Sequence, residues 1–343
     1  MTHKFRKTVV SAALAGAAVF ASNAFAAPAG TGPMNSIADS WHNLGSGNIK
    51  GATPNGGTPA NHSTQTGEIC VFCHTPHGGD NSAAVPIWNR KLNDPANYIR
   101  YSANNSTTFD AEEGEVGSTT IACLSCHDGA QAIDALINAP GSGNYTDWST
   151  APFGSAAYLA WAGGSTSMTG ADINPATGAL ASGIVQNLGT DLSNDHPVSM
   201  QYGGGGITGA GGVATGTTID PDFTQVGTAR SINDQSGSAV SMVMNAKANP
   251  SPTINTVFWI ERSDSLNPND RDREDVIMYT RNHGGQFQPF VECGSCHDPH
   301  NVDNPTFLRT SNGIPSTNTA LAAMFPGSVN DPASGLCLTC HAK

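Results

Sequence analysis

Apolar residues form only short runs along this chain, and long stretches rich in Gly, Pro, Ser, Thr and Asn separate them. The clearest run, NTVFWIER at 255–262, is apolar enough to predict a buried or edge strand. The plausible helices are short and fall around 88–101, 130–138 and 318–325. The pattern therefore predicts a mostly irregular (coil) fold with few short helices and strands.

The region from about 140 to 290 is expected to form loops with short strands and no hydrophobic core of its own. Its stretch QYGGGGITGAGGVATGT, residues 201–217, cannot be a helix interior because each glycine loses too much backbone entropy there. The segment NPNDRDRED, residues 267–275, is typical of a solvated, charged surface. We expect this region to cover a core formed elsewhere, within a single domain.

Residues 1–26 have the features of a secretory signal peptide. A basic start precedes an apolar run at 8–20, and the small residues of AFA at 24–26 fit a cleavage site. Because the run is too short to span a bilayer, we expect cleavage after Ala26 rather than an uncleaved membrane anchor. The mature chain, 27–343, is then expected to be secreted, and no other segment is apolar enough to span a membrane.

Composition and charge narrow the possible functions. Without its first 26 residues the chain has 12 Lys and Arg against 27 Asp and Glu, a formal charge of −15, which argues against nucleic-acid binding. Leu, Ile, Val and Phe together make up only 60 of the 343 residues, a fraction typical of disordered chains when the net charge is high. Either the chain is largely unfolded, or something other than side chains supplies its apolar core.

The eight cysteines fall into four Cys-x-x-Cys pairs, and a histidine follows each pair directly. Cys-x-x-Cys-His is the attachment motif of c-type haem, in which two thiols form thioethers to the porphyrin and the imidazole binds the iron. A zinc site or a redox dithiol is the alternative for a lone pair. Four histidines would follow four pairs by chance with a probability of about one in a million, so we predict four covalent haems. The motifs are Cys70, Cys73 and His74; Cys123, Cys126 and His127; Cys293, Cys296 and His297; and Cys337, Cys340 and His341.

Four haems would also explain the sparse aliphatic residues, because the chain can wrap around a stacked haem core. The motifs cluster at the two ends of the chain, and 167 residues separate Cys126 from Cys293. The similar order of residues at each end indicates a degenerate repeat. We expect two-haem units at about 60–135 and 285–343, joined by a glycine-rich connecting region at 140–285.

The second axial ligand of each iron decides whether it can bind a substrate or only transfer electrons. His77 lies three residues after His74 on the same side of the porphyrin, so it is better placed to bind a neighbouring haem than its own. CGSCHDPH repeats this arrangement with His300. Methionine is the competing ligand, but histidines are in surplus and would give lower potentials. The favoured second ligands are His42, His77, His196 and His300; His62 or His283 could replace one of them.

The segments EICVFCHTPHGG…PIWNR, CLSCHDG, DHPVS and VECGSCHDPHN resemble the doubled-CxxCH multihaem cytochromes of metal-respiring bacteria. The resemblance is greatest to the extracellular, OmcE-like tetrahaem type that polymerises into conductive filaments, and it covers the two ends of the chain. It implies bis-histidine haems stacked in one continuous row, with copies of the chain as partners. It also implies that His42 binds a haem of the adjoining subunit, which would make an open, head-to-tail polymer.

The leading hypothesis is therefore a secreted tetrahaem filament that conducts electrons to extracellular metal or electrode acceptors and to other redox proteins, without being an enzyme. A soluble periplasmic tetrahaem electron shuttle is the first alternative. A multihaem reductase is the second, but it needs an iron with an exchangeable position, and no motif replaces its histidine by lysine. A structural surface protein with incidental haem is the third.

Overall fold

The structure is a computed structural model, and every residue it describes belongs to the compact unit Gly32–Lys343. The predicted signal peptide, the predicted helix at 318–325 and most of the stretches 201–217 and 267–275 lie outside the described residues. The described residues are 37–40, 42–45, 62–63, 66–102, 111, 113–129, 136–138, 161–162, 187–202, 222–227, 229–233, 239–248, 256–263, 271, 275–283, 286–301, 304, 307–310 and 335–341.

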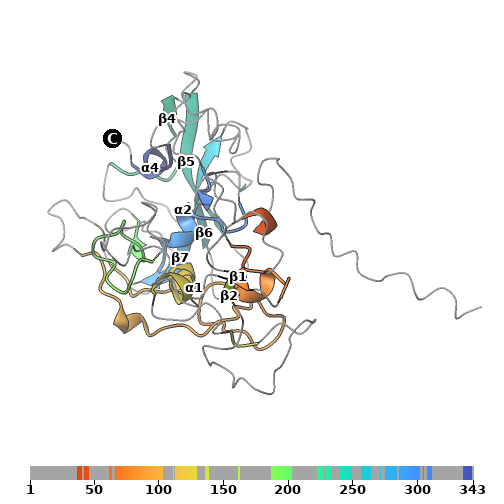
Figure 1. The fold of residues 1–343 in the computed structure, drawn as a ribbon. Coiled ribbons are helices and arrows are strands. Elements are labelled where there is room, and N and C mark those ends of the chain that lie inside the picture. Colours follow the sequence, from red (N-terminus) through yellow and green to blue (C-terminus); the bar gives the residue numbers. More distant parts are fainter. Residues whose placement is uncertain are drawn as a thin grey trace, which may run out of the picture. The chain divides into compact units, whose positions relative to one another are not determined.

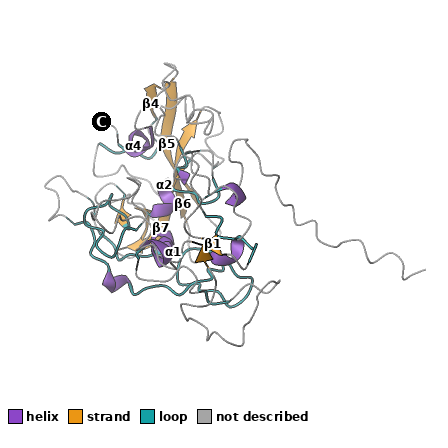
Figure 2. Cartoon of the chain, in the orientation of Figure 1, coloured by secondary structure: helices purple, strands orange, loops and turns teal. Residues whose placement is uncertain are grey.

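A six-stranded antiparallel sheet is the largest element (Figures 1 and 2). Its strand order is β3-β8-β7-β6-β5-β4, so β4 to β8 form a meander and β3 joins its far edge. The strand predicted at 255–262 is confirmed as β6, and its Phe258 pairs with Met278. The strands are β3 (Met200–Gln201), β4 (Arg230–Asn233), β5 (Ala239–Ala248), β6 (Thr256–Ser263), β7 (Val276–His283) and β8 (Gln286–Val291). A separate two-stranded pair joins β1 (His62–Ser63) to β2 (Trp161–Ala162).

The sheet has a hydrophobic core, so the expectation that 140–290 lacks a core of its own is wrong. In β5 the side chains of Met242 and Met244 are buried, whereas Ser241 is exposed. This is the period-two pattern of a strand with one covered face. Methionine supplies much of this core, which is why a count of Leu, Ile, Val and Phe underestimated it. The core cluster is Tyr202, Met242, Met244, Phe258, Ile260, Val276, Met278 and Leu336.

The described helices are short, and four of the six lie at the Cys-x-x-Cys pairs. The six are α1 (Ser118–His127), α2 (Cys293–Cys296), α4 (Gly335–Cys340) and the 3₁₀ turns η1 (Ile37–Asp39), η2 (Cys70–Phe72) and η3 (Pro95–Asn97). Contacts join α2 to β7 and α4 to β6, so the sheet positions the third and fourth motifs. None of the helices that the structure describes has the length and apolarity needed to cross a membrane.

The helix predicted at 88–101 is wrong. Only Pro95–Asn97 forms a helical turn, with the Asp94 carboxylate accepting a hydrogen bond from the backbone N–H of Ala96. Trp88 and Arg90 are extended and form β-bridges, and Pro95 disfavours helical conformation in the residue before it. Of the helix predicted at 130–138, residues 130–135 lie outside the described residues, and Leu136 forms a bridge with Arg90.

Candidate functional site

Each Cys-x-x-Cys pair lies on a helical turn that brings its two thiols to one side. The N–H of His74 donates to the carbonyl of Cys70 at 2.7 Å, and the same contact joins His297 to Cys293 at 2.9 Å and His341 to Cys337 at 2.9 Å. In the second motif the turn is the last one of α1. All eight cysteines are described, and all eight are free thiols. The four motifs therefore present paired thiols and a histidine in the same local geometry.

Electrostatic contacts between thiols show which motifs are neighbours. Burial raises the pKa of Cys73 to about 12, and Cys126 of the second motif contributes to the rise. A hydrogen bond between the thiols of Cys123 and Cys293 links the second motif to the third, and with burial it holds the pKa of Cys123 well above its ordinary value. Contacts between α1 and α2 agree with this pairing.

The third and fourth motifs are neighbours as well. Burial raises the pKa of Cys296 to about 11, with Cys293 and then Cys337 adding to the effect. Burial also raises the pKa of Cys340, with Cys296 as the next cause. Each motif therefore lies beside the next one along the chain, which the sequence did not show.

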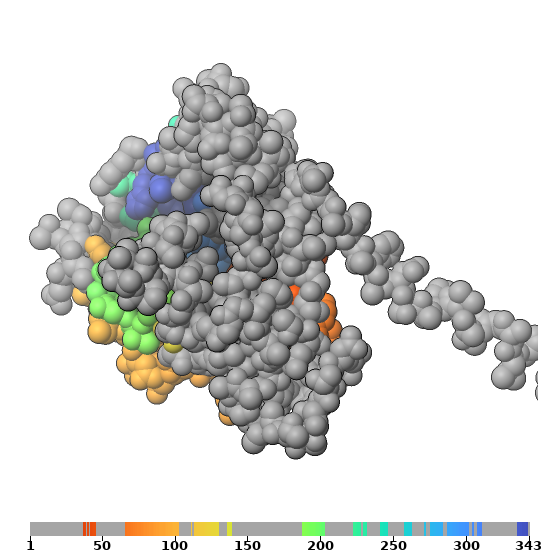
Figure 3. Space-filling view, in the orientation of Figure 1, coloured from red at the N-terminus to blue at the C-terminus, as the bar shows by residue number. Residues whose placement is uncertain are grey.

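The ends of this series are the most exposed. Cys70 of the first motif and Cys337 of the fourth are exposed, whereas the thiols between them in the series are partly covered. On the face drawn in Figure 3, atoms of the last described segment, in dark blue, reach the surface.

His74 of the first motif faces His300, one of the predicted second ligands. Their rings are nearly parallel, at 15°, and their centroids are 6.2 Å apart. Two imidazoles that bind one metal ion from opposite sides have centroids about 6 Å apart, because each metal–nitrogen bond is about 2 Å and each nitrogen lies about 1 Å from its ring centre. The centroid separation therefore equals the one that two imidazoles would have if both held one iron.

The other ring nitrogens of this pair have partners of their own. Nδ1 of His74 lies 3.0 Å from the carbonyl oxygen of Pro86. Nδ1 of His300 lies 3.4 Å from the Asp298 carboxylate, which raises the pKa of His300, and Arg309 holds Asp298 from the other side at 3.4 Å. Such contacts orient metal-binding imidazoles and leave Nε2 as the coordinating atom.

A second histidine pair has the same separation. The ring of His42 lies 6.2 Å from the ring of His127, the histidine of the second motif, with an angle of 68° between the planes. Phe307 stacks on the ring of His42, with the ring centroids 4.2 Å apart and an angle of 2° between the planes. Burial lowers the pKa of His42 to about 3, and His127, His297 and His300 lower it further, so the ring is neutral, the form that binds metals.

The remaining predicted ligands are not brought into such pairs. His77 is exposed, and its carbonyl oxygen accepts hydrogen bonds from Thr75 and Asn138. His196 is exposed too, with Nδ1 3.0 Å from the carbonyl oxygen of Pro197. Within the described residues neither ring faces a motif histidine, and their role as ligands stays a prediction. The side chain of His62 lies outside the described residues, and the ring of His283 lies 5.7 Å from Phe290.

The loops that follow the first and third motifs share their backbone contacts. Trp88 bridges to His74, and Leu308 bridges to His297 in the same way. The residues before them, Ile87 and Phe307, both have a positive φ, which is uncommon for residues other than glycine. The two loops therefore turn back on their motif histidines by one mechanism, although they differ in length.

Three buried or partly buried arginines hold the Cys-x-x-Cys turns, and the sequence analysis missed them. Arg90 donates to the carbonyl of Ser125 in the second motif, Arg309 to Gly294 in the third, and Arg230 to Leu338 in the fourth. Arg90 and Arg309 each lie four residues after a proline, which was a usable local signal. Arg230 is more than a hundred residues from its partner, so no local pattern marks it.

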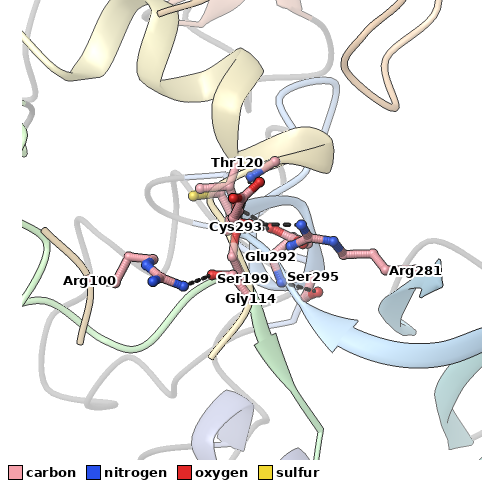
Figure 4. A network of polar contacts seen from close by, with 10 residues as sticks. Arg100, Gly114, Thr120, Ser199, Arg281, Glu292, Cys293 and Ser295 are labelled. Carbon is pink, nitrogen blue, oxygen red and sulfur yellow. Dashed lines mark hydrogen bonds and ion pairs between the residues drawn. The ribbon is translucent and has the colours of Figure 1, made fainter. Parts of the chain in front are cut away.

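A buried polar network joins the second motif to the third, and it was missed too. Figure 4 shows the Glu292 side chain among Thr120, Ser199 and Arg281. Glu292 also begins α2 with a reciprocal capping box, since its N–H donates to the Ser295 hydroxyl at 3.0 Å. Its sequence position, one residue before Cys293, gives no sign of the contact with Thr120.

Comparison with known protein families found no match for this chain, and comparison with curated proteins found none either. Among the described residues, no group of three or more His, Cys, Asp or Glu side chains is arranged to hold a metal ion. Two ring pairs among the described histidines, His74 with His300 and His42 with His127, have centroids 6.2 Å apart.

Proposed function

We propose that this chain is a secreted tetrahaem c-type cytochrome that transfers electrons and has no catalytic activity of its own. The observation that carries the proposal is the pairing of two motif histidines, His74 and His127, with histidines from distant segments at 6.2 Å. Pairs of this separation fit an iron held from both sides, which favours electron transfer over substrate binding.

The chain's own residues suit that cofactor in several ways. The thiol pairs lie on turns beside each motif histidine, free to form thioethers. His300 and His42 would complete the first and second sites, while Asp298 and the carbonyl of Pro86 would orient the imidazoles. When bound, the haem supplies one-electron chemistry at its iron. The polypeptide excludes water, fixes the ligands and sets the distance between successive sites.

The position of His42 bears on whether the protein is a discrete carrier or a filament. Its pairing with His127 of the same chain favours a discrete electron carrier, in which the second site is complete within one subunit. The filament remains the second candidate, because the segment that carries His42 could bind the next chain instead of its own by domain swapping. In that form His42 would carry the link between subunits.

The proposal is tested on protein purified from a host that attaches c-type haem. Four low-spin, six-coordinate haems per chain, all reducible and none binding carbon monoxide, are the expected result. Carbon monoxide binding to the unmodified, reduced protein would instead support the reductase alternative. Electron microscopy of the exported material separates the carrier from the filament.

A further inference from the structure

The Glu292 carboxylate is one of the most completely buried acidic groups among the described residues. Its side chain has no exposed surface. Oε2 accepts hydrogen bonds from the hydroxyl of Thr120 at 2.5 Å and from that of Ser199 at 2.9 Å. Oε1 accepts one from Arg281 at 3.2 Å. A carboxylate is seldom buried this fully unless a structural or functional role retains it.

This carboxylate lies at the junction between the second and third motifs. Thr120 belongs to α1, three residues before Cys123, and its hydroxyl oxygen also accepts a hydrogen bond from the N–H of Cys293 at 3.0 Å. Glu292 itself precedes Cys293. The network therefore connects the attachment cysteines of two different motifs, and Figure 4 shows Cys293 within it.

Few positive charges lie close enough to stabilise the ionised carboxylate. Arg281 of β7 is its only cationic hydrogen-bond partner among the described residues, and the Arg281 side chain is 23% exposed. The other titratable groups on the packed elements are Tyr279 and His283 of β7, Cys123, Cys126 and His127 of α1, and Cys293 and Cys296 of α2. Glu115 lies beside them, and its backbone carbonyl accepts from Arg281 at 2.7 Å. Burial raises the pKa of Glu292 to about 7, against the opposite effects of Thr120, Arg281 and Ser199.

We propose that Glu292 couples proton uptake to the reduction of the two inner haems, those of the second and third motifs. The inference rests on the proposed function, since it requires haems at those motifs. An anionic carboxylate between two attachment sites favours the oxidised, more positive state of both irons. Adding an electron removes one positive charge, and the carboxylate then holds a proton more strongly.

The step balances in charge and atoms. One electron enters from a redox mediator or an upstream electron donor, and one proton moves from solvent to a carboxylate oxygen of Glu292. Reoxidation reverses both transfers. Because the proton is taken up on reduction, raising the pH across the range in which Glu292 titrates makes reduction less favourable.

The test is a spectroscopic redox titration of the four-haem protein between pH 5 and 9, on the unmodified chain, Glu292→Gln and the control Glu115→Gln. Glu115 is an exposed glutamate on a neighbouring segment that takes part only through its carbonyl. Two of the four haems are expected to become harder to reduce as the pH rises through about 7, by up to about tenfold in the reduction equilibrium constant per pH unit. Glu115→Gln should keep this dependence, and Glu292→Gln should remove it and ease reduction of the same two haems at high pH.

Two further measurements keep the test decisive if Glu292→Gln does not mature. Arg281→Gln removes the opposing cation, so it should move the pH-dependent range upward. Infrared difference spectra of reduced minus oxidised protein should gain the signal of a protonated carboxyl, and Glu292→Asp should shift that signal without abolishing it. Four haems with pH-independent potentials, or an unchanged slope in Glu292→Gln, would overturn this inference alone. A protein without four haems would overturn the proposed function along with it.

Discussion

At the scale of single residues, the orientation of His300 depends on a chain of charges. Arg309 is buried, donates to the Gly294 carbonyl at 2.9 Å, and contacts the Asp298 carboxylate. Asp298 in turn contacts Nδ1 of His300. Hydrogen bonds from the His300 side chain and backbone, together with the charge of Arg309, lower the pKa of Asp298 to about 2 against the effect of burial, so it is ionised at neutral pH. This arrangement fixes Nδ1 of His300, so Nε2 is the ring nitrogen left for a ligand role.

Replacing His300 by alanine removes the imidazole that faces His74, so one iron of four should lose its sixth ligand. The reduced variant is expected to bind about one carbon monoxide per chain, measured by optical titration, where the unmodified protein binds none. His283→Ala serves as the control, because the ring of His283 lies 5.7 Å from Phe290. An unchanged His300→Ala spectrum, or an iron opened by His283→Ala, would contradict the pairing.

At the scale of elements, the loop after the first motif stores backbone strain. Ile87 is a β-branched residue with φ of 50°, and its side chain is 43% exposed, so packing does not explain its presence there. Gly79 permits the turn, because a Cβ at that position would lie 2.8 Å from the carbonyl carbon of Ile87. The strain is retained because the loop is fixed by its contacts with His74 and Thr75.

Changing Ile87 to glycine should relieve this strain and raise the free energy of unfolding by about 1 kcal/mol. Ile99 is the matched control: it is 59% exposed and is not among the residues with positive φ, so Ile99→Gly should lower stability by about the same amount through backbone entropy. Denaturant unfolding of both variants measures the two effects. Shifts of the same sign would count against the strained turn.

The sheet is the second element whose contribution can be measured. Phe258 is fully buried, pairs with Ala246 of β5 and Met278 of β7, and belongs to the cluster against which Cys296 and Cys340 pack. Phe258→Ala should therefore cost about 3–5 kcal/mol in denaturant unfolding, whereas Ser241→Ala on an exposed position should change little. A cost below about 1 kcal/mol for Phe258→Ala would mean that the sheet core does not support the third and fourth motifs.

The sequence predicted the local features of this protein better than the distant ones. The strand at 255–262 and the four thiol pairs are visible in short patterns. The predicted ligands His300 and His42 lie near motif histidines, and their role as ligands stays a prediction. The pairing of His300 with His74 spans more than two hundred residues and depends on how β7, β8 and α2 position the third motif. Burial of Glu292 likewise depends on partners from three separate segments, which no local periodicity reveals.

At the scale of the whole molecule, the two motifs near the start of the sequence lie beside the two motifs near its end. The connecting region contributes a folded sheet, and this sheet contacts α2 and α4. His42 reaches His127 within the same chain, and Phe307 from the third motif's loop stacks on it. Contacts between segments that are far apart in the sequence therefore hold the four motifs together.

The position of His42 predicts how ligation depends on concentration. If His42 completes the second site within its own chain, the low-spin fraction should stay constant when the protein is diluted to a monomer, as followed by absorbance alongside light scattering. His42→Ala should open one iron at every concentration. Loss of a ligand on dilution of the unmodified protein would instead show that His42 acts between subunits, as the filament requires.

The central claim is that all eight thiols are used to attach four haems. Intact mass measurement of the denatured, thiol-alkylated protein tests it most directly. The account predicts a chain beginning at residue 27 that carries the mass of four haems and no alkyl groups. A chain with alkylated cysteines, or with fewer than four haem masses, would contradict it.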